Sequence, residues 1–341
     1  MRYRSLRRSY VRIATFAARI FRKRVGIVRV FVLGGTGSIG SAVVQELVQR
    51  GHEIWGLARS EVSAARLREL GAMPVAGDAA APEVWAAKLL QVDAVIHASC
   101  DFNTGMDAID RHLLDVLLPA LAAQPKRPRF IYTGGCWLFG AAGDDVATEE
   151  TPFHPLPDFA WMVPHLRRIL ETAEIDGIVI HPAMVYTPGG GVFLRFAREA
   201  IEREAIRVVE SEAVRWPLVH SRDLANLYAL ALEKAPARSS YIGAAIDGLA
   251  VGRIARAFAM RRGTRRQQPQ IIPAEMIAAE LGAWAKGYAL DQRLSGAKAR
   301  RELGWKRASR ARTRNRAASV TGVENEKPAD TQRAFVKLCQ F

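Results

Sequence analysis

Short apolar runs alternate with amphipathic segments along the first two thirds of the chain. Each run is nearly continuous, without alternation of apolar and polar residues, which is typical of strands that helices cover on both faces. The runs are residues 27–33, 52–58, 73–78, 93–99, 129–135, 177–185 and 241–245. Segments with helical spacing at 41–51 and 62–71 end in glycine. The pattern predicts βαβ units, and therefore an α/β fold with a doubly wound parallel sheet.

The pattern changes after Pro188. A glycine loop and a charged helical segment follow, and a helix is expected at 224–235. Residues 251–306 have helical spacing with more polar positions, whereas the sequence from Ala308 onward has little apolar content. We therefore expect a smaller, mainly helical C-terminal lobe, followed by a disordered tail.

The positive charge of the chain lies at its ends. Of the net +15, residues 1–29 carry +10 and residues 298–316 carry +8, which leaves −3 for the remainder. Basic ends are more often solvated tails than nucleic-acid surfaces, with contact to phosphate or an anionic membrane as the alternative. We expect no nucleic-acid partner. We also expect no membrane partner, because no apolar run approaches the ~18 residues that span a bilayer.

The first 26 residues are rich in arginine and contain no acid. They resemble an organelle transit peptide and lack the unbroken apolar stretch of a secretory signal. The alternative, which we favour, is a basic extension outside the fold, either disordered or produced by a start site assigned too far upstream.

The three cysteines, Cys100, Cys136 and Cys339, follow no pairing or metal-binding pattern. Their small number favours a reducing compartment, so we expect a cytoplasmic protein without a metal site. Free cysteine is among the most buried residue types, and we expect Cys100 and Cys136 to be small buried side chains.

A glycine-rich loop separates the first strand from the first helix. The residues expected to bind a dinucleotide are Gly34, Thr36, Gly37, Ser38, Ile39 and Gly40. Gly34 permits the tight turn, Gly37 lets the backbone approach a pyrophosphate, and Gly40 lets the helix pack close to the strand. The helix N-terminus offers free N–H groups and about half a positive charge to the phosphates. This position, after the first strand of a βαβ series, is the context that dinucleotide binding requires.

Arg59 and Ser60 stand about twenty residues further on, where an NAD-binding protein would place an acid. An arginine can pair with the 2′-phosphate of NADP and has no special partner in a bare hydroxyl. We therefore expect NADP, with NAD as the alternative. The alternative is that Arg59 is a solvated surface arginine. The nearby carboxylate of Glu61 weighs against the assignment to NADP.

Seven segments of the chain, in order, resemble those of the extended and atypical short-chain dehydrogenase/reductases, the NAD-dependent epimerase/dehydratase family. The resemblance covers about residues 28–306. The segments are GGTGSIG, the Gly-Asp pair at 77–78, IHAS, IYTGGCWLFG, HPAMVYTPGGG, VHSRDLANLYALALE and SGAKARRELGW. Each segment is weak evidence alone, and seven in register are strong.

The resemblance implies a Rossmann domain at 27–190 and a substrate lobe at 191–306 that includes the last Rossmann helix and strand. The basic extension is then 1–26 and the disordered basic tail 307–341. It also implies an NAD(P)-dependent oxidoreductase or epimerase/dehydratase that transfers hydride at a carbonyl or alcohol carbon of a small molecule, often a nucleotide sugar. Many members pair through a helix bundle, so a homodimer is a further expectation.

The resemblance also assigns residues to the cofactor. Asp78 matches the family's adenine contact. Ala98 and Ser99 match the end of the fourth strand, whose backbone lies under the cofactor. Pro182 matches the segment beside the nicotinamide.

The chain departs from the family at the residues that carry the chemistry. Members use a Tyr general acid/base, a Lys four residues on that lowers its pKa, and a Ser/Thr that orients the substrate oxygen. By spacing, the Ser/Thr position falls on Gly135, and the Tyr and Lys positions fall on Phe159 and Val163 or on Trp161 and His165. Neither register supplies a phenol or an ammonium group.

Three side chains are candidate catalytic replacements. His165 can shuttle protons near neutral pH or hydrogen-bond a ribose hydroxyl, and the alternative is a partly exposed histidine on a polar helix face. Thr133 either orients a substrate oxygen or bonds the backbone at the strand end. Tyr186, near the expected nicotinamide, is the third candidate for proton chemistry.

Other polar residues have mainly structural expectations. We expect His181 to be buried against the sheet and His220 to position the start of the next helix. Asp101 and Asn103, just past the fourth strand, are candidate substrate contacts. Pro164 fits best in a first helical turn, so the helix that contains it should begin late.

Two functions remain open on the sequence alone. One is an active NADP-dependent enzyme whose acid/base work has moved to other residues. The other is a non-catalytic NADP-binding sensor or scaffold, which the missing Tyr and Lys favour and the retained substrate lobe disfavours.

Overall fold

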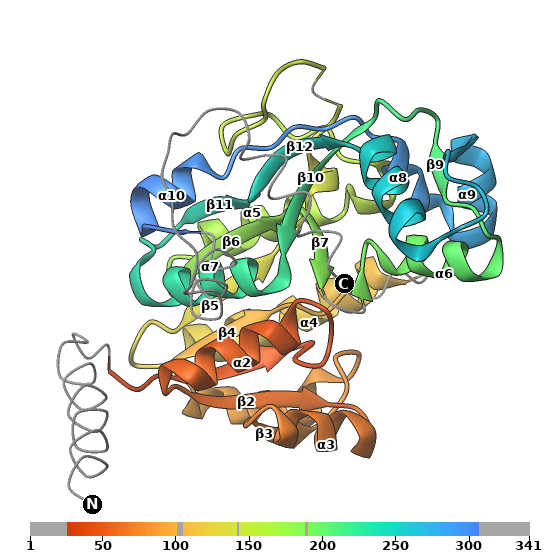
Figure 1. Cartoon of the computed structure of the whole chain (residues 1–341). Helices are drawn as coiled ribbons and strands as arrows, with labels where there is room; N and C mark the ends of the chain where they lie inside the picture. The colour runs from red at the N-terminus through yellow and green to blue at the C-terminus, as the bar shows by residue number, and fades with distance from the viewer. Residues whose placement is uncertain (1–25, 101–104, 142, 188–189, 307–341) are drawn as a thin grey trace, which may run out of the picture.

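The computed structural model describes residues 26–100, 105–141, 143–187 and 190–306 (Figure 1). The expected C-terminal tail and nearly all of the expected N-terminal extension lie outside these residues. So do the candidate substrate contacts Asp101 and Asn103.

A seven-stranded parallel sheet forms the centre of the molecule. Its strands are β1 (Arg29–Leu33), β2 (Glu53–Ala58), β3 (Met73–Ala76), β4 (Ala94–His97), β5 (Arg129–Thr133), β6 (Asp176–Pro182) and β11 (Ser239–Gly243). They follow the order β11-β6-β5-β4-β1-β2-β3, and every neighbouring pair is parallel. The order reverses between β1 and β4, which is where ligands bind in open sheets of this kind. The predicted doubly wound α/β sheet is confirmed.

Helices cover both faces of this sheet (Figure 1). One face carries α2 (Gly40–Arg50), α3 (Glu61–Glu69) and α7 (Ser221–Lys234); the other carries α4 (Met106–Ala122), α5 (Met162–Glu171) and the 3-10 turns η1 (Pro82–Val84) and η2 (Ala86–Gln91). Two more 3-10 turns, η3 (Cys136–Leu138) and η4 (Pro157–Phe159), follow β5. Pro164 lies in the first turn of α5, which confirms the predicted position of this proline in its helix.

The C-terminal lobe is mainly helical, as predicted, but it also contains two small sheets that were not predicted. A four-stranded sheet has the order β12-β10-β7-β8, and a second sheet pairs β13 with β9. The lobe consists of β7 (Met184–Thr187), β8 (Gly190–Gly191), α6 (Leu194–Glu202), β9 (Arg207–Val209), β10 (Arg215–His220), β12 (Ile246–Ala250), α8 (Val251–Arg262), β13 (Gln270–Ile272), α9 (Ala274–Leu281) and η5 (Ala283–Ala289). The last helix, α10 (Ala297–Leu303), returns to pack against α7 and β11.

The single strand expected at 177–185 is wrong, because the structure divides this segment between two sheets. β6 ends at Pro182 and pairs with β5 and β11, whereas β7 pairs with β10 in the lobe. Proline has no N–H to donate to a ladder, so continued pairing is disfavoured there. Between the two strands, Ala183 donates its N–H to the carbonyl oxygen of Gly243 in β11 at 3.2 Å.

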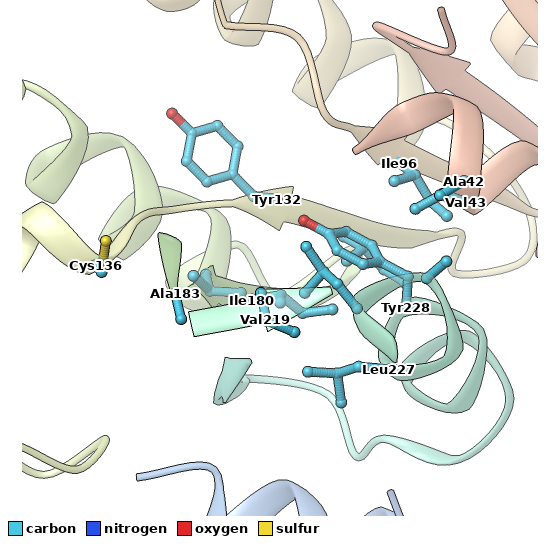
Figure 2. Packing of buried hydrophobic residues seen from close by; sticks show 14 of the residues in the cluster. Ala42, Val43, Ile96, Tyr132, Cys136, Ile180, Ala183, Val219, Leu227 and Tyr228 are labelled. Carbon is cyan, nitrogen blue, oxygen red and sulfur yellow. The ribbon is translucent and has the colours of Figure 1, made fainter. Parts of the chain in front are cut away.

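The end of β5 presents side chains to both faces of the large sheet. Successive residues of a strand point to opposite faces, so Tyr132 lies toward α4 and Thr133 toward α7. Figure 2 shows the rings of Tyr132 and Tyr228 on opposite sides of this strand. Both tyrosines are buried in the core. A polar group at this strand end therefore belongs to one face or to the other.

Candidate functional site

The glycine loop joins β1 to α2 at the carboxyl edge of the large sheet. Gly34 has φ +76°, and a Cβ placed on it would lie 2.5 Å from the carbonyl oxygen of Ala98, just past β4. A Cβ on Gly40 would overlap the carbonyl oxygen of Gly34. Thr36 and Ser38 are exposed at the loop tip, and no side chain of the described residues caps α2. No described side chain therefore competes with an anion at the start of α2, where the N–H of Ser41 donates to the carbonyl oxygen of Gly37 at 3.0 Å.

A pocket of about 460 Å³ lies at the carboxyl ends of β2 and β3. Its charged and polar lining residues are Arg59, Ser60, Glu61, Arg68 and Asp78. Arg68 pairs with Glu61 at 2.6 Å, whereas Arg59 makes no hydrogen bond or ion pair to the part of the chain that the structure describes. The Ser60 hydroxyl caps α3 by accepting the backbone N–H three residues on. Arg59 is thus the cation of this pocket that is not engaged by a carboxylate.

His165 is buried in a polar cluster between α5, α4 and the sheet. Its Nδ1 lies 2.6 Å from Asp110 Oδ2, and His97 Nε2 lies 2.7 Å from Asp110 Oδ1. The hydroxyl of Tyr132 donates to Asp110 Oδ2 at 2.8 Å. Burial alone would raise the pKa of Asp110, but the attraction of His97 in its protonated form and the hydrogen bonds from His165, His97 and Tyr132 hold this pKa well below its usual range. Asp110 is therefore an ionised carboxylate that accepts three hydrogen bonds.

Thr133 lies on the other face of the sheet. Its hydroxyl is 2.6 Å from the hydroxyl of Tyr228 in α7. Burial raises the pKa of Tyr228, and the hydrogen bond with Thr133 lowers it by a smaller amount. The phenol therefore stays protonated near neutral pH.

Tyr186 belongs to the lobe, in β7. Its ring contacts those of Phe193 and His220, with ring centres 5.3 Å and 5.2 Å away. His220 Nδ1 accepts the backbone N–H of Arg222 and caps α7. This confirms that His220 positions the start of this helix.

The remaining site candidates lie along the carboxyl edge or just beneath it. Ala98 and Ser99 follow β4 and are partly exposed, and Pro182 is buried at the end of β6. His181 is 1% exposed, which confirms its predicted burial, and this burial lowers its pKa to about 4.

The structure thus brings the cofactor candidates together and keeps the catalytic candidates apart. Gly34 and Ala98 touch, with the pocket of Arg59 further along the same edge. His165 and Thr133 reach opposite faces of the sheet, and Tyr186 lies in the second sheet.

Sequence reasoning missed Asp110. The signal was present, because Asp110 precedes Leu113, Leu114 and Leu117 by three, four and seven positions, on the apolar face of α4. An acid on such a face is rarely buried unless it has partners. A search for polar residues that could meet it would have led to His97, the polar residue that ends the apolar strand β4.

Both Cys100 and Cys136 were predicted to be buried, and the structure confirms this for Cys136 alone. Cys136 is buried at the start of η3, and burial raises the pKa of its thiol to about 12. Cys100 is exposed, and the prediction of its burial was wrong. It lies three residues beyond β4, where the chain has left the sheet.

Within the part of the chain that the structure describes, no group of three or more His, Cys, Asp or Glu side chains is placed to hold a metal ion. No described helix is long and apolar enough to cross a membrane.

Comparison with known proteins identifies the family. Uncharacterized protein C2A9.02 of Schizosaccharomyces pombe is 29% identical over 82% of this chain and 94% of its own length. A dTDP-glucose 4,6-dehydratase from Streptomyces venezuelae, solved with NAD and TYD bound, aligns with a TM-score of 0.70 at 18% identity, over 91% of this chain and 96% of that one. Human epimerase family protein SDR39U1, solved with NADPH, aligns with a TM-score of 0.65 at 19% identity, over 82% of this chain and 95% of that one.

At these identities the two solved structures establish the fold alone. A family model matches residues 30–243, from the glycine loop through the last strand of the large sheet. The chain therefore belongs to the NAD dependent epimerase/dehydratase family.

Proposed function

We propose that the protein is an NADP(H)-dependent oxidoreductase or epimerase/dehydratase that acts on a carbonyl or alcohol carbon of a small molecule. The observation that carries this proposal is the close contact of Gly34 with Ala98, which keeps the start of α2 clear for phosphate groups. A side chain at Gly34 or Gly40 would disrupt that contact. When bound, the nicotinamide would supply or accept a hydride.

The preference for NADP rests on the pocket at the ends of β2 and β3. Arg59 is exposed there and engaged by no described carboxylate, so its guanidinium is available to a 2′-phosphate. Glu61 lines the same pocket, but Arg68 pairs with it and offsets its negative charge.

Replacing Arg59 by glutamine should weaken the binding of NADPH and leave that of NADH within twofold. A hydrogen bond to a charged group contributes about 1.5–3 kcal/mol, so the Kd for NADPH should rise about tenfold to a hundredfold. Fluorescence titration of the reduced cofactors measures both constants. Arg66→Gln is the matched control, because Arg66 lies on α3, pairs with Glu69 and does not line the pocket. Equal losses for NADPH and NADH would contradict the 2′-phosphate assignment.

His165, Thr133 and Tyr186 are the proposed catalytic side chains. We assign proton exchange with the substrate oxygen to His165, because its Nε2 is not engaged by Asp110. Thr133 would orient the substrate oxygen if its hydroxyl gives up Tyr228, and Tyr186 would act from the lobe side.

Alanine at His165 should lower kcat about a hundredfold in NADPH oxidation with a panel of carbonyl compounds and nucleotide sugars, since a general acid/base contributes ~10²–10⁴-fold. Thr133→Ala should lower kcat by a smaller factor, because a threonine only orients the oxygen. His112→Ala, an exposed histidine on α4, is the control and should keep full activity. Unchanged rates in both site variants would remove these residues from the mechanism.

A second function, binding of NADP(H) without catalysis, is favoured by one observation. The Thr133 hydroxyl and His165 Nδ1 are both already bonded to partners, on opposite faces of the sheet. This function requires NADPH binding with no hydride transfer to any member of the same panel.

A further inference from the structure

Four buried side chains from four elements meet at one carboxylate. His97 comes from β4, Asp110 from α4, Tyr132 from β5 and His165 from α5. Each of the four residues is at most 7% exposed. Burying a carboxylate costs free energy, which its three hydrogen bonds offset. Losing any one of the three donors would raise that cost, because the carboxylate would be less well paired. The arrangement therefore fixes the donors in place relative to one another.

The carboxylate determines which nitrogen of His165 carries a proton. An ionised carboxylate can only accept, so the nitrogen 2.6 Å from it, Nδ1, must be an N–H donor. In the neutral ring the proton on Nδ1 leaves Nε2 as the acceptor. Solvated histidine has no such constraint, since either nitrogen can carry the proton.

Asp110 engages the other ring nitrogen in His97, Nε2, than in His165. Its Nε2 donates to Asp110, while its Nδ1 lies 3.4 Å from the backbone nitrogen of Ser99 and 3.3 Å from the Ser99 hydroxyl. A backbone N–H can only donate, so Nδ1 of His97 serves as an acceptor. Asp110 thus holds two imidazoles, and His97 is tied down through both of its nitrogens.

The nitrogen of His165 that Asp110 does not engage, Nε2, lies on the side of the carboxyl edge of the sheet. Because α4 follows β4, its first turn lies at the carboxyl edge of the sheet. Asp107 is one turn closer to that edge than Asp110, and His165 Nε2 lies 3.7 Å from Asp107 Oδ1. The imidazole therefore extends from the buried Asp110 toward the edge, with Nε2 on the outer side. The ring of Trp161 packs against it edge-on, with ring centres 5.3 Å apart.

We propose that Asp110 is a positioning residue that holds His165 in the Nδ1–H tautomer and directs Nε2 to the carboxyl edge for proton exchange with the substrate oxygen. This inference rests on the proposed function. In the reducing direction, a bound reduced nicotinamide would supply a hydride to the carbonyl carbon, and the carbonyl π electrons would move to the oxygen. That oxygen takes the Nε2 proton of the doubly protonated ring, leaving neutral His165 with Nδ1–H still on Asp110. A solvent proton then restores the ring.

The tautomer can be measured without turnover. In the full chain labelled with ¹⁵N-histidine, two-bond proton–nitrogen spectra distinguish the two tautomers, and the signals that disappear in His165→Gln assign this ring. We expect His165 to be Nδ1–H in the unmodified protein. Asp110→Asn preserves the shape of the side chain but replaces one acceptor oxygen by a donor NH₂ group. Loss of the Nδ1–H signal is therefore expected, with kcat lowered about a hundredfold and the Kd for NADPH unchanged within twofold.

Asp115→Asn is the matched control, because Asp115 also lies on α4 and also bonds a residue of α5, Arg168, but at the surface. It should change neither the tautomer of His165 nor kcat. A circular dichroism spectrum and melting temperature close to those of the unmodified protein establish that Asp110→Asn is folded. If it is not, the tautomer in the unmodified protein decides the inference.

An Nε2–H tautomer in the unmodified protein, or full kcat in folded Asp110→Asn, overturns the inference. Absence of turnover with every substrate despite NADPH binding overturns the proposed function instead. The tautomer signal is independent of turnover, so the two failures are distinguishable.

Discussion

Substituting Gly37 by aspartate should abolish useful cofactor binding while the protein remains folded. A Cβ at this exposed position would meet Gly34 O at 3.4 Å, which is ordinary van der Waals contact, and Gly37 does not have positive φ. The new carboxylate would stand where we propose that the pyrophosphate approaches the loop, so two anions would compete for the same N–H groups. We expect the Kd for NADPH to rise at least ~100-fold, a loss of about 2.7 kcal/mol. Calorimetric titration measures it.

Gly26→Asp is the control for the added charge. A Cβ at Gly26 has nothing within 4 Å, and this residue precedes β1 at the opposite end of the strand. It should leave the Kd unchanged. A Gly37→Asp protein that binds NADPH with its original affinity would show that the glycine loop is not the phosphate site.

Glu199→Ala should destabilise the lobe more than any surface substitution. Glu199 in α6 accepts hydrogen bonds from the backbone N–H and Nε of Arg207 in β9 and from Nη1 of Arg195, at 2.8–3.0 Å. Arg207 in turn forms two hydrogen bonds with Glu280 in α9, at 2.7 and 2.8 Å. Removing Glu199 leaves two guanidinium groups, each at most 10% exposed, with too little compensating charge. Breaking such a buried pair costs about 3–5 kcal/mol.

Urea unfolding monitored by circular dichroism gives this change in the free energy of unfolding. Glu202→Ala, three residues further along α6 and exposed, is the matched control and should change it by no more than about 0.5 kcal/mol. A loss below about 1 kcal/mol in Glu199→Ala would mean that the arginines find other partners.

The large sheet could be predicted because its strands are buried on both faces. Val30, Phe31, Val32 and Leu33 of β1 are all fully buried, so the chain shows an unbroken apolar run there. The same property made the run 177–185 misleading. It remains apolar across Ala183 because both of the strands that meet there are buried, and hydrophobicity carries no information on which partner each strand takes.

Only the part of the candidate site that the backbone forms, the glycine loop, could be predicted from the sequence. Glycines 34 and 40 are required by steric contacts that any loop of this shape must satisfy, and spacing alone reveals them. The Asp110 cluster depends on side chains that are 13, 22 and 55 residues from Asp110 in the sequence, which only the packing of α4 and α5 against the sheet brings together. The exposure of Cys100 likewise depends on where the chain leaves the sheet.

The division of the chain between two sheets also limits how such a protein can be rearranged by recombination. The chain passes from β6 into the lobe, returns through α7 and β11, enters the lobe again at β12 and comes back to α7 with α10. A gene segment ending near residue 190 would encode a sheet without β11, with β6 as a bare edge and α2 without the helix it packs against. The large sheet is therefore not encoded by one contiguous segment that a single crossover could exchange.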